Sequence, residues 1–500
     1  MKYKVLDLFA GAGGLSLGFE KTDLFSVSVA IENNPCAKET YRTNFPDTTI
    51  LNDIREFSDF SQFINNYGSF DVIIGGPPCQ GFSNANRQHN QIINLNNLLV
   101  KKYIEFVLGI LPKVFVLENV KMLNSNTHFF LLSNDDFLFQ NVSNQRLHKE
   151  RIKIGGGLVL SEVLQFHSGN CIQFPDTPIL EIKKLLSLRC KKKEKGKDIN
   201  SQIKQLIDGN KTLLQLLEPS KEEISSMYIM TKEFEEKVRS FSILSELSNQ
   251  NIFVETIYEN ENELTIICYS LIVKKYIEAR LKDTYQLKDD IYNTAEFGVP
   301  QKRERFVMIG VRKDLCKSLV AIKPINTIPK YNTVHDAIYD LEQVIPSTKI
   351  DKKGIKRVVK NTGSLKTLCD STYIWNHFIT DSSPVALQRF SLIKQGQNFH
   401  ALDKKYISSY ANPEKTQNSI YKRLEYSEPS PTVTNVRKCM WIHPTQNRAI
   451  SIREAARLQS FPDSFIFCGS KDRQYQQVGN AVPPLFAKAI AKAVIKILKS

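Results

Sequence analysis

The sequence lacks the marks of membrane, secreted and zinc-stabilised proteins. No apolar run approaches the length that spans a bilayer, so we expect no membrane association. The N-terminus leads from Met1-Lys2-Tyr3-Lys4 directly into an apolar run typical of a core strand, so we expect no signal peptide and a cytoplasmic location. The nine cysteines include no CxxC pair, which argues against a zinc site and against a disulfide framework. Internal repeats are absent as well.

The bulk composition is that of an ordinary globular protein with a basic surplus. With 500 residues the chain is too long for one compact core, so two or three domains are expected. Lysine and arginine total 67 against 52 acidic residues, a formal net charge of +15. Such a surplus fits a well-solvated surface, but it also favours a polyanionic partner, because neutralised phosphates release condensed counterions.

The texture of the chain changes along its length. Four apolar runs, Val5–Phe9, Ser26–Ile31, Asp71–Gly75 and Val114–Leu117, are typical of strands buried on both faces of a parallel sheet. From about 124 to 265 the chain is polar and rich in Lys and Glu, with helical periodicity from about 203 to 247. The α/β texture returns with 296–310, and 311 to about 445 is irregular before an amphipathic C-terminal helix.

A glycine-rich turn follows the first predicted strand. In Asp7-Leu8-Phe9-Ala10-Gly11-Ala12-Gly13-Gly14 the glycines allow a sharp turn and a close approach to a ligand at a helix N-terminus. The second strand ends at Glu32, an acid placed to accept hydrogen bonds from ribose hydroxyls. This pattern predicts a nucleoside-binding domain, although many glycine-rich turns hold no ligand. The G-x-G-x-x-G pattern fails at Ser16, which disfavours NAD.

A cysteine follows the third strand in a stiff loop. Gly75-Gly76-Pro77-Pro78-Cys79-Gln80-Gly81 lies just past a strand, where ligands of open α/β sheets bind. The prolines restrict the backbone and hold the thiol in place. A buried structural cysteine is the alternative, but this stretch offers little apolar packing. We therefore favour a nucleophile at Cys79.

Charged residues mark two further strands. Val114–Leu117 runs into Glu118, an acid that could donate a proton to a ring nitrogen or could simply be solvated. In the block Gly298-Val299-Pro300-Gln301-Lys302-Arg303-Glu304-Arg305, strand alternation sends Arg303 and Arg305 to one face. These two arginines could be surface charge, or could hold a phosphate and a base.

These four motifs, in this order, resemble those of the DNA (cytosine-5) methyltransferase family, the bacterial modification enzymes in particular. Two later blocks, Arg453–Asp463 and Gln477–Pro484, resemble that family too, and the likeness covers about half the chain. It implies a Rossmann-like α/β fold that binds S-adenosylmethionine. It also implies methyl transfer to carbon 5 of cytosine in a specific double-stranded DNA sequence, without a metal. Since a stacked base is out of reach, the cytosine must flip out of the duplex.

The resemblance implies roles for individual residues. Cys79 matches the nucleophile that adds to carbon 6 of cytosine, Glu118 the acid that engages N3, and Arg303 and Arg305 the arginines that support the base and the reacting groups. The cofactor positions are matched by Phe9, Gly11, Gly13, Glu32, Asp53, Ile54, Pro78, Leu98, Asn480 and Val482. The charged neighbours usual before Leu98 are missing from Ile93-Asn94-Leu95-Asn96-Asn97.

The resemblance also predicts the domain organisation. The catalytic and cofactor-binding domain comprises 1–123 and 266–312, and 446–500 returns to complete it. A target-recognition domain occupies 313–445. The polar residues of this domain suited to base edges and phosphates are Trp375, Asn376, His377, Arg389, Gln395, Gln397, Asn398, Arg423 and Arg437, although most of them are expected only to solvate loops.

Residues 124–265 form an insertion longer than the family usually has, expected to be a helical surface subdomain. Its basic run Lys191–Lys197 is either passive, which we favour, or an arm that grips DNA phosphates. We expect a monomer that acts on DNA at the nucleoid. It would be either the modification enzyme of a restriction-modification system, with a cognate restriction endonuclease as a candidate partner, or an orphan counterpart of such an enzyme.

Two other functions compete with this one. One branch of the family methylates transfer RNA, but its Cys-Phe-Thr triplet does not occur here. A non-catalytic DNA-binding regulator would also keep the fold, but the complete set of Cys79, Glu118 and Arg305 argues against it.

Overall fold

The structure, a computed structural model, describes residues 2–78, 95–155, 158, 160–191, 196–218, 220–260, 263–324, 331–350, 353–357, 365–410 and 412–500. The chain forms two compact units. The first comprises 1–79, 100–121 and 282–500, and the second comprises 80–99 and 122–281. Cys79 lies outside the described residues.

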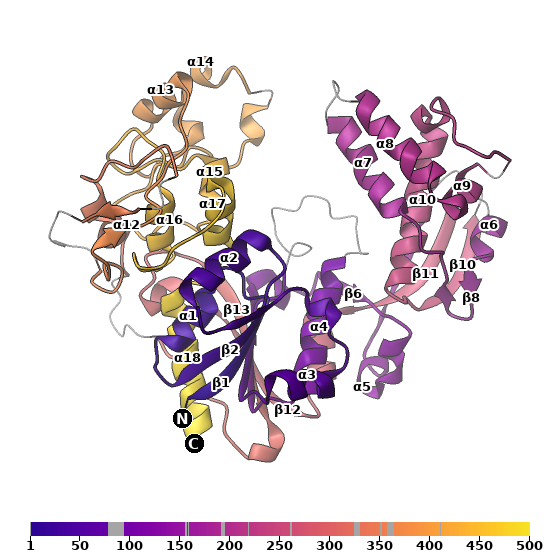
Figure 1. Cartoon of the computed structure of the whole chain (residues 1–500), viewed down its shortest axis with the longest axis horizontal. Helices are drawn as coiled ribbons and strands as arrows, with labels where there is room; N and C mark the ends of the chain where they lie inside the picture. The colour runs from indigo at the N-terminus through magenta and orange to yellow at the C-terminus, as the bar shows by residue number, and fades with distance from the viewer. Residues whose placement is uncertain are drawn as a thin grey trace. The chain divides into compact units, whose positions relative to one another are not determined.

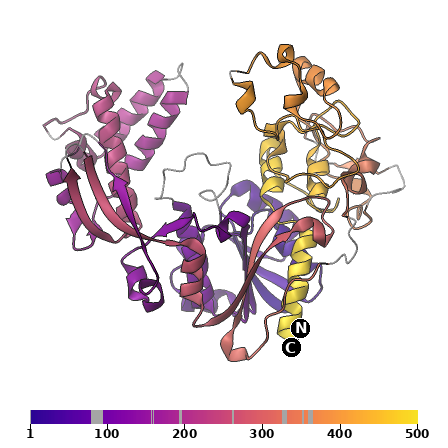
Figure 2. The same cartoon turned by 180° about the vertical axis from the view of Figure 1, so that it is seen from behind.

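The first unit is built on a seven-stranded sheet (Figures 1 and 2). Its strand order is β12 (Tyr285–Asn293), β13 (Glu304–Arg312), β5 (Val114–Val120), β4 (Val72–Gly75), β1 (Tyr3–Leu8), β2 (Phe25–Ile31) and β3 (Thr49–Leu51). Strands β1 to β5 are mutually parallel, and β13 runs antiparallel to β5 and to β12. The four predicted strands and the Rossmann-like fold class are confirmed. Strand β12 was not predicted.

The helices of the α/β core are α1 (Gly14–Glu20), α2 (Pro35–Asn44), α3 (Phe60–Tyr67), α4 (Leu95–Ile110) and α18 (Pro484–Lys499). The last of them packs on the first although they are far apart in sequence (Figure 1). At their crossing a Cβ on Gly18 would lie 2.3 Å from the Cβ of Ala487, so glycine is needed for this close approach. The apolar face of α18, with Phe486, Ile490 and Val494, is buried in the same core as β1 and β4.

Residues 313–500 also contribute short elements joined by long irregular segments. These are α12 (Val334–Ile338), β14 (Ile355–Lys356), β15 (Tyr373–Ile374), α13 (Pro384–Leu392), α14 (Lys404–Ile407), α15 (Val436–Cys439), α16 (Ile452–Leu458) and α17 (Lys471–Asn480). Residues 311–445 were predicted to have irregular structure, and the structure confirms short elements joined by irregular segments there.

Four of the polar residues considered for DNA contact have structural roles instead. Asn376, His377, Arg389 and Arg423 are buried. The Arg423 guanidinium alone donates to the carbonyl oxygens of Ile393, at 2.6 Å, and His443, at 2.8 Å. Loops without a regular hydrogen-bond ladder leave carbonyls to be satisfied, and these side chains satisfy them.

A buried ion network ties this part of the chain together. The guanidinium of Arg457, in α16, contacts Asp340 at 2.5 Å and Asp463 at 2.7 Å. Arg357 pairs with the same two carboxylates. Arg457 and Asp463 are fully buried, so neither carboxylate could be left alone without a large desolvation cost.

The second unit combines helices with an antiparallel sheet. Its helices are α5 (Gln140–Ser143), α6 (Leu160–Leu164), α7 (Ile179–Lys191), α8 (Gly196–Asp208), α9 (Lys211–Leu217), α10 (Lys232–Asn249) and α11 (Val273–Leu281). Its strands are β6 (Phe129–Leu131), β7 (His148–Lys153), β8 (His167–Ser168), β9 (Cys171–Ile172), β10 (Val254–Asn260) and β11 (Glu263–Ile272). The helical texture was predicted for this segment, but the sheet in which β11 pairs with β10, β6 and β7 was not. Throughout the described ranges, no helix is both long and apolar enough to cross a membrane.

We expect Arg457→Met to destabilise the first unit by about 3–5 kcal/mol, because two buried carboxylates then depend mainly on Arg357 and negative charge stays uncompensated. The exposed pair of Arg437 with Asp472, at 2.8 Å, offers the control Arg437→Gln, which should cost less than about 1 kcal/mol. Urea unfolding followed by tryptophan fluorescence measures both, because Trp375 and Trp441 are the two tryptophans of the chain and both lie in the first unit. Equal destabilisation by the two variants would contradict this account.

Candidate functional site at the carboxyl edge of the sheet

The candidate residues gather where the parallel strands end. Phe9 follows β1, Glu32 follows β2, Asp53 follows β3 and Pro78 follows β4, while Glu118 lies near the end of β5. Parallel strands place their carboxyl ends along one edge, which is the usual binding edge of such sheets. Strand β13 is antiparallel and begins at Glu304, so Arg305 returns to this edge opposite Val120.

The glycine loop after β1 is tied to the end of β2. Phe9, Gly11 and Gly13 all have positive φ, at 62°, 56° and 94°. The Gly11 amide donates to Oε2 of Glu32 at 2.9 Å, and the amide of Asn34 donates to Oε1 at 2.7 Å. A Cβ on Gly13 would lie 2.4 Å from the Phe45 ring, whereas one on Gly11 would meet nothing within 4 Å. The loop is therefore packed on one side and open beside Gly11.

A buried polar cluster lies under this loop. The Ser16 hydroxyl donates to the Asp7 carboxyl at 2.5 Å and lies 2.7 Å from the Tyr41 hydroxyl. The pKa of Asp7 is raised to about 7, with burial as the largest cause; the Glu32 charge also raises this pKa, and the hydrogen bond from Ser16 opposes both. The Asp7 side chain links the end of β1 to α1 and α2, the two helices that hold the loop.

Other predicted cofactor residues differ in exposure. Asp53 caps a short 3-10 helix, and its carboxylate pairs with Arg55 at 2.6 Å, which lowers its pKa. Ile54 is buried and Asn480, at the end of α17, is exposed. The Val482 carbonyl lies against Gly14, where a Cβ would be 2.3 Å from that oxygen. Leu98 lies half-buried in the first turn of α4.

The acid predicted on β5 lies beside the loop that leads to Cys79. A Cβ on Gly76 would be 3.0 Å from Oε2 of Glu118, so the carboxyl lies directly against this loop. The Asn119 side-chain amide, on β5, donates to the carbonyl of Pro77 at 3.0 Å and so attaches the loop to this strand. Arg305 contacts Oε1 of Glu118 at 2.8 Å. The structure thus brings together Glu118, Arg305 and the Gly76–Pro78 segment.

Arg303 has a different role from Arg305. It is buried, precedes β13, and donates to the carbonyls of Val433, at 2.7 Å, and Gly479, at 3.0 Å. Next to it, the buried Gln301 accepts from the Val433 amide at 2.6 Å and donates to Gln459 at 2.7 Å. These bonds hold the segments before α15 and at the end of α17 against the start of β13.

The electrostatics of Glu118 suit an acid. Burial raises the pKa of its carboxyl, while the positive charges of Arg305 and Arg303 lower it. Because burial is the largest cause, the carboxyl holds a proton at a higher pH than an exposed glutamate does. It can donate that proton to a base nitrogen while Arg305 stabilises the carboxylate that results.

Asn119, Gln301, Ser16 and Tyr41 were not predicted as functional. Asn119 directly follows Glu118 at the end of an apolar run, which was the available signal, and Gln301 stands inside the quoted block 298–305. Ser16 and Tyr41 carried no such signal, because only the fold brings them to Asp7.

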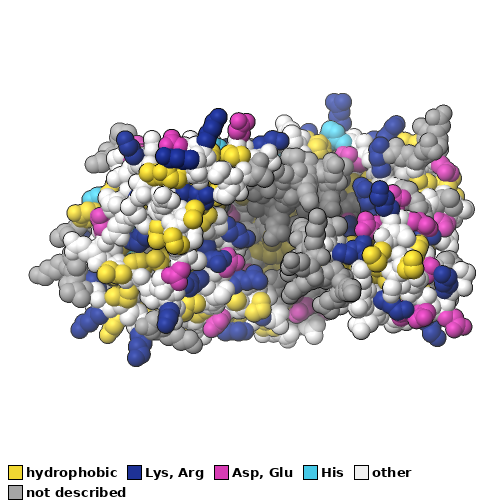
Figure 3. Space-filling model, turned by 90° about the horizontal axis from the view of Figure 1, so that it is seen from above, with side chains coloured by type: hydrophobic (Ala, Val, Ile, Leu, Met, Phe, Trp, Pro, Cys, Tyr) yellow, Lys and Arg dark blue, Asp and Glu magenta, His cyan; other side chains and the backbone are white. Residues whose placement is uncertain are grey.

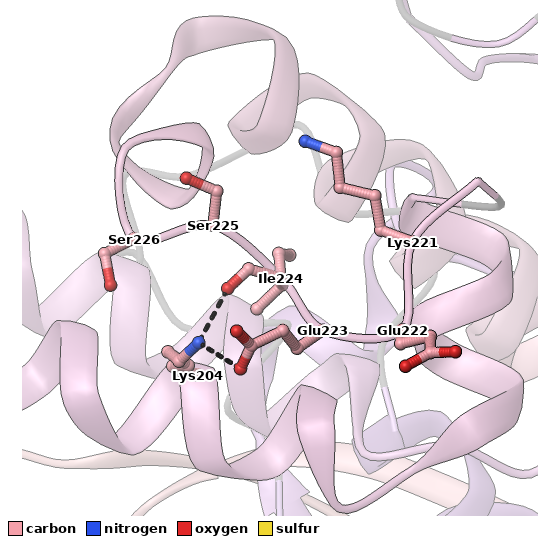
Figure 4. A pocket seen from close by; sticks show the side chains of 7 residues that line it. All are labelled: Lys204, Lys221, Glu222, Glu223, Ile224, Ser225 and Ser226. Atoms are coloured by element: carbon pink, nitrogen blue, oxygen red, sulfur yellow. Dashed lines mark hydrogen bonds and ion pairs between the residues drawn. The ribbon is translucent and has the colours of Figure 1, made fainter.

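The second unit has a surface pocket of about 500 Å³ (Figure 4). Lys204, the base at its floor, pairs with Glu223 at 3.1 Å and donates to the Ile224 carbonyl at 3.0 Å. Its charge is thus balanced within the pocket, and we assign no function to it.

A family model described as C-5 cytosine-specific DNA methylase matches residues 3–134 and 254–496. The chain is similar to the Type II methyltransferase M1.HphI of Haemophilus parahaemolyticus, with 29% identity over 99% of this chain and 88% of that protein. It is also similar to the Type II methyltransferase M.DdeI of Desulfomicrobium norvegicum, with 24% identity over 98% of this chain and 88% of that one. The fold resembles the crystal structure of a DNA modification methyltransferase encoded within an E. coli prophage, with a TM-score of 0.58 and 20% identity over the full length of both chains.

We expect Asp7→Asn to flatten the pH dependence of stability. The native state keeps a proton on Asp7 up to about pH 7, whereas the unfolded chain loses it near 3.8. The stability that this proton provides is therefore complete below the unfolded value and is lost as pH rises through about 7. The slope in that window is at most about 1.4 kcal/mol per pH unit.

Asparagine still accepts from Ser16 but does not titrate, so the slope should disappear. Urea unfolding at pH values between 4 and 7.5 measures it, with the exposed Asp23→Asn as the matched control. Parallel stability curves for Asp7→Asn and the unmodified protein would refute the assignment.

Proposed function

Since the chain belongs to the C-5 cytosine-specific DNA methylase family and is a DNA (cytosine-5)-methyltransferase, we propose that it methylates cytosine in one specific duplex sequence through a covalent Cys79 adduct on a flipped-out base. We further propose that it is the modification enzyme of a Type II system and acts as a monomer at the nucleoid. Its restriction partner would cleave the same sequence. The observation that carries the proposal is the Glu118 carboxyl, buried against Gly76 and paired with Arg305 at 2.8 Å.

S-adenosylmethionine fits the residues at the sheet edge. The open space beside Gly11 leaves room for a ligand to approach the backbone, and Glu32 is held at the end of β2 by two amides. Phe9, Gly11 and Gly13 would form the loop along its methionine and adenine sides, and Asn480 and Val482 would complete the pocket beside Gly11. Glu32 would accept from its ribose, and Asp53, Ile54 and Leu98 would contact its adenine. Pro78 is the remaining predicted cofactor residue. When bound, this cofactor supplies an electrophilic methyl group.

The chemistry requires a nucleophile and an acid on the same ring. Carbon 5 of cytosine is a poor nucleophile until the Cys79 thiolate bonds to carbon 6 and the ring accepts a proton at N3. Glu118 donates that proton, and Arg305 holds the carboxylate left behind. Once carbon 5 carries the methyl group, loss of the proton on carbon 5 to a base expels the Cys79 thiolate, and N3 returns its proton to the Glu118 carboxylate, which restores the ring. Asn119 contributes by fixing the carbonyl of Pro77 two residues before the thiol.

Residues 313–445 are proposed to select the target sequence. They follow β13 directly, and Arg303 and Gln301 attach the Val433 segment to the start of that strand. With Asn376, His377, Arg389 and Arg423 buried, the base-contacting candidates that remain are Trp375, Gln395, Gln397, Asn398 and Arg437.

Cys79→Ala should abolish methyl transfer while cofactor affinity persists, because without the thiolate no adduct forms. A duplex with 5-fluorocytosine at every cytosine should trap the unmodified protein covalently, since fluorine cannot leave as a proton does. Covalent trapping is detected on a denaturing gel. Methyl transfer from labelled cofactor measures activity, and methylation-sensitive sequencing of plasmid DNA identifies the target sequence. The exposed Cys316→Ala is the control and should trap normally. Trapping by Cys79→Ala, or transfer to transfer RNA in place of DNA, would contradict the proposal.

Glu118→Gln should lower kcat by about 10²–10⁴-fold, because the amide cannot deliver a proton to N3. Cofactor affinity, measured by calorimetry, should stay unchanged. Glu304→Gln is the matched control, since Glu304 lies on the same strand as Arg305 but is exposed and pairs with Lys121 at 2.5 Å. A kcat for Glu118→Gln within a few-fold of the control would remove Glu118 from the mechanism.

A further inference from the structure

A short loop in the first unit carries two glutamines. Residues 393–398 connect α13 to the turn that precedes α14 (Figure 1). In this loop Gln395 and Gln397 are exposed, and Gly396 between them has a φ of 77°. A Cβ on Gly396 would also lie 2.9 Å from Oε2 of Glu425, so the turn requires glycine. The two glutamines therefore project from a loop whose conformation is fixed at its centre.

Backbone bonds hold this loop against the segment around Arg423. The Gly396 amide donates to the Arg423 carbonyl at 3.2 Å, and the Arg423 amide donates to the Gln397 carbonyl at 3.0 Å. The Lys422 ammonium donates to the Gly396 carbonyl. The buried Arg423 guanidinium donates to the Ile393 carbonyl at 2.6 Å. Because several bonds would break if the loop shifted, it forms a rigid support for its two side chains.

Each glutamine has its side-chain oxygen engaged by a backbone amide. Oε1 of Gln395 accepts from the Tyr426 amide at 3.2 Å, and Oε1 of Gln397 accepts from the Lys394 amide at 3.0 Å. An N–H group bonds only to the oxygen of a carboxamide, so these bonds decide which end of each side chain is nitrogen. Among the described residues, no acceptor engages either side-chain nitrogen. Each nitrogen therefore presents its donor hydrogens in a preset direction.

The segment that holds Gln395 leads back to the catalytic strand. Glu428 pairs with Lys302 at 3.0 Å. The Lys302 amide donates to the Ser430 carbonyl at 2.9 Å, and the Ser430 amide donates to the Pro300 carbonyl at 3.0 Å. Glu428 and Ser430 follow Tyr426 by two and four positions. The loop is therefore attached, within a few residues, to the start of β13.

The other side chains considered for base contact are already engaged within the protein. Asn398 accepts from one backbone amide and donates to one carbonyl, both at 3.0 Å. Arg437 pairs with Asp472 at 2.8 Å. The Trp375 ring lies against Gly354, where a Cβ would be 3.1 Å from it. The two glutamines differ from these residues because their donor nitrogens are available.

The charges around the loop favour a base edge over a phosphate. The Glu425 carboxylate lies beside Gly396 and repels phosphate oxygens, whereas the edge of a base is neutral. Of the two lysines next to the loop, Lys394 is exposed, but Lys422 is turned to the Gly396 carbonyl. We therefore expect the glutamines to contact bases.

The basic side chains of the surface are scattered. In the view of Figure 3, the coloured lysine and arginine side chains are interspersed with acidic ones and form no continuous field. Of the basic run Lys191–Lys197, residues 192–195 lie outside the described ranges. Because contacts to phosphates carry no sequence information, discrimination between sequences has to come from individual donors and acceptors.

We propose that the side-chain nitrogens of Gln395 and Gln397 donate to guanine in the major groove of the target sequence. This inference rests on the proposed function, which supplies duplex DNA as the substrate. Guanine presents two neighbouring acceptors in that groove, O6 and N7, whereas adenine and cytosine present an amino group that opposes a donor. Glutamine reads adenine with its oxygen and nitrogen together, and here backbone amides already engage both oxygens. The two glutamines are thus specificity-determining residues.

The variants Gln395→Glu and Gln397→Glu test the proposal. Glutamate keeps the oxygen that accepts from the backbone amide but replaces the donor nitrogen with a second acceptor. The exposed Gln388→Glu, on α13, is the matched control, because it adds the same charge to the same part of the chain. Each protein recovers duplexes by binding from a random-sequence pool. Sequencing of these duplexes gives the base preferences without requiring methyl transfer.

The unmodified protein and Gln388→Glu should recover the same sequence. Each loop variant should lose the preference for guanine at one position by about 5-fold or more and should favour cytosine or adenine there, because their amino groups donate. Replacing that guanine with inosine, which keeps O6 and N7, should leave binding by the unmodified protein unchanged. Circular dichroism verifies that all variants are folded.

Each glutamine is judged by its own variant. The proposal is overturned by a loop variant that keeps the guanine preference, by an equal loss in Gln388→Glu, or by an unmodified protein that recovers no preferred sequence. Loss of binding to the inosine duplex would also overturn it, because guanine would then be read through N2 in the minor groove.

Methyl transfer from labelled cofactor to the recovered duplex is measured alongside. A guanine preference without methyl transfer counts against the proposed function. Methyl transfer by loop variants whose base preference is unchanged counts against the role of the two glutamines alone.

Discussion

The buried guanidinium of Arg303 connects three parts of the chain that are remote in sequence. It bonds to carbonyls 130 and 176 residues further on, beside the backbone bridge that pairs Gln301 with Ser430. Charge-assisted bonds to backbone oxygens are strong where water is excluded. The Val482 carbonyl can therefore rest on Gly14, and Arg305, two residues along, meets Glu118 from the neighbouring strand. This side chain, together with Gln301 and the packing of α18 on α1, holds the two ends of the chain at the site.

Much of this arrangement could be predicted from the sequence, because buried parallel strands and the motifs at their ends leave local signals. Val72–Gly75 and Val114–Leu117 are uninterrupted apolar runs, and Glu118 follows the second of them. The antiparallel sheet of the second unit left no such signal. His148-Lys149-Glu150-Arg151-Ile152-Lys153 is polar at five of six positions, and its strand character comes from pairing with β11, more than 100 residues later. The Ser16–Asp7–Tyr41 cluster escaped prediction for the same reason, since it depends on tertiary contact.

The buried arginines change what the basic composition means. Arg303, Arg423, Arg453 and Arg457 are each no more than 4% exposed, and they bond to carbonyls or carboxylates inside the chain. Arginine suits this use because its planar group offers five donors and stays charged when buried. Part of the net charge of +15 therefore belongs to buried arginines that bond to groups inside the protein. Attraction to a polyanion depends on where the remaining cations lie.

Residues 122–281 of the second unit lie between β5 and β12, which are separated by β13 in the sheet. This connection leads from the carboxyl end of β5 back to the opposite side of the sheet, where β12 begins. Its last helix before β12 is α11. Lengthening it changes no strand order and no register, so neither the glycine loop nor the acid is disturbed. The connection can therefore vary in length and content while the strands that carry the glycine loop and Glu118 keep their order and register.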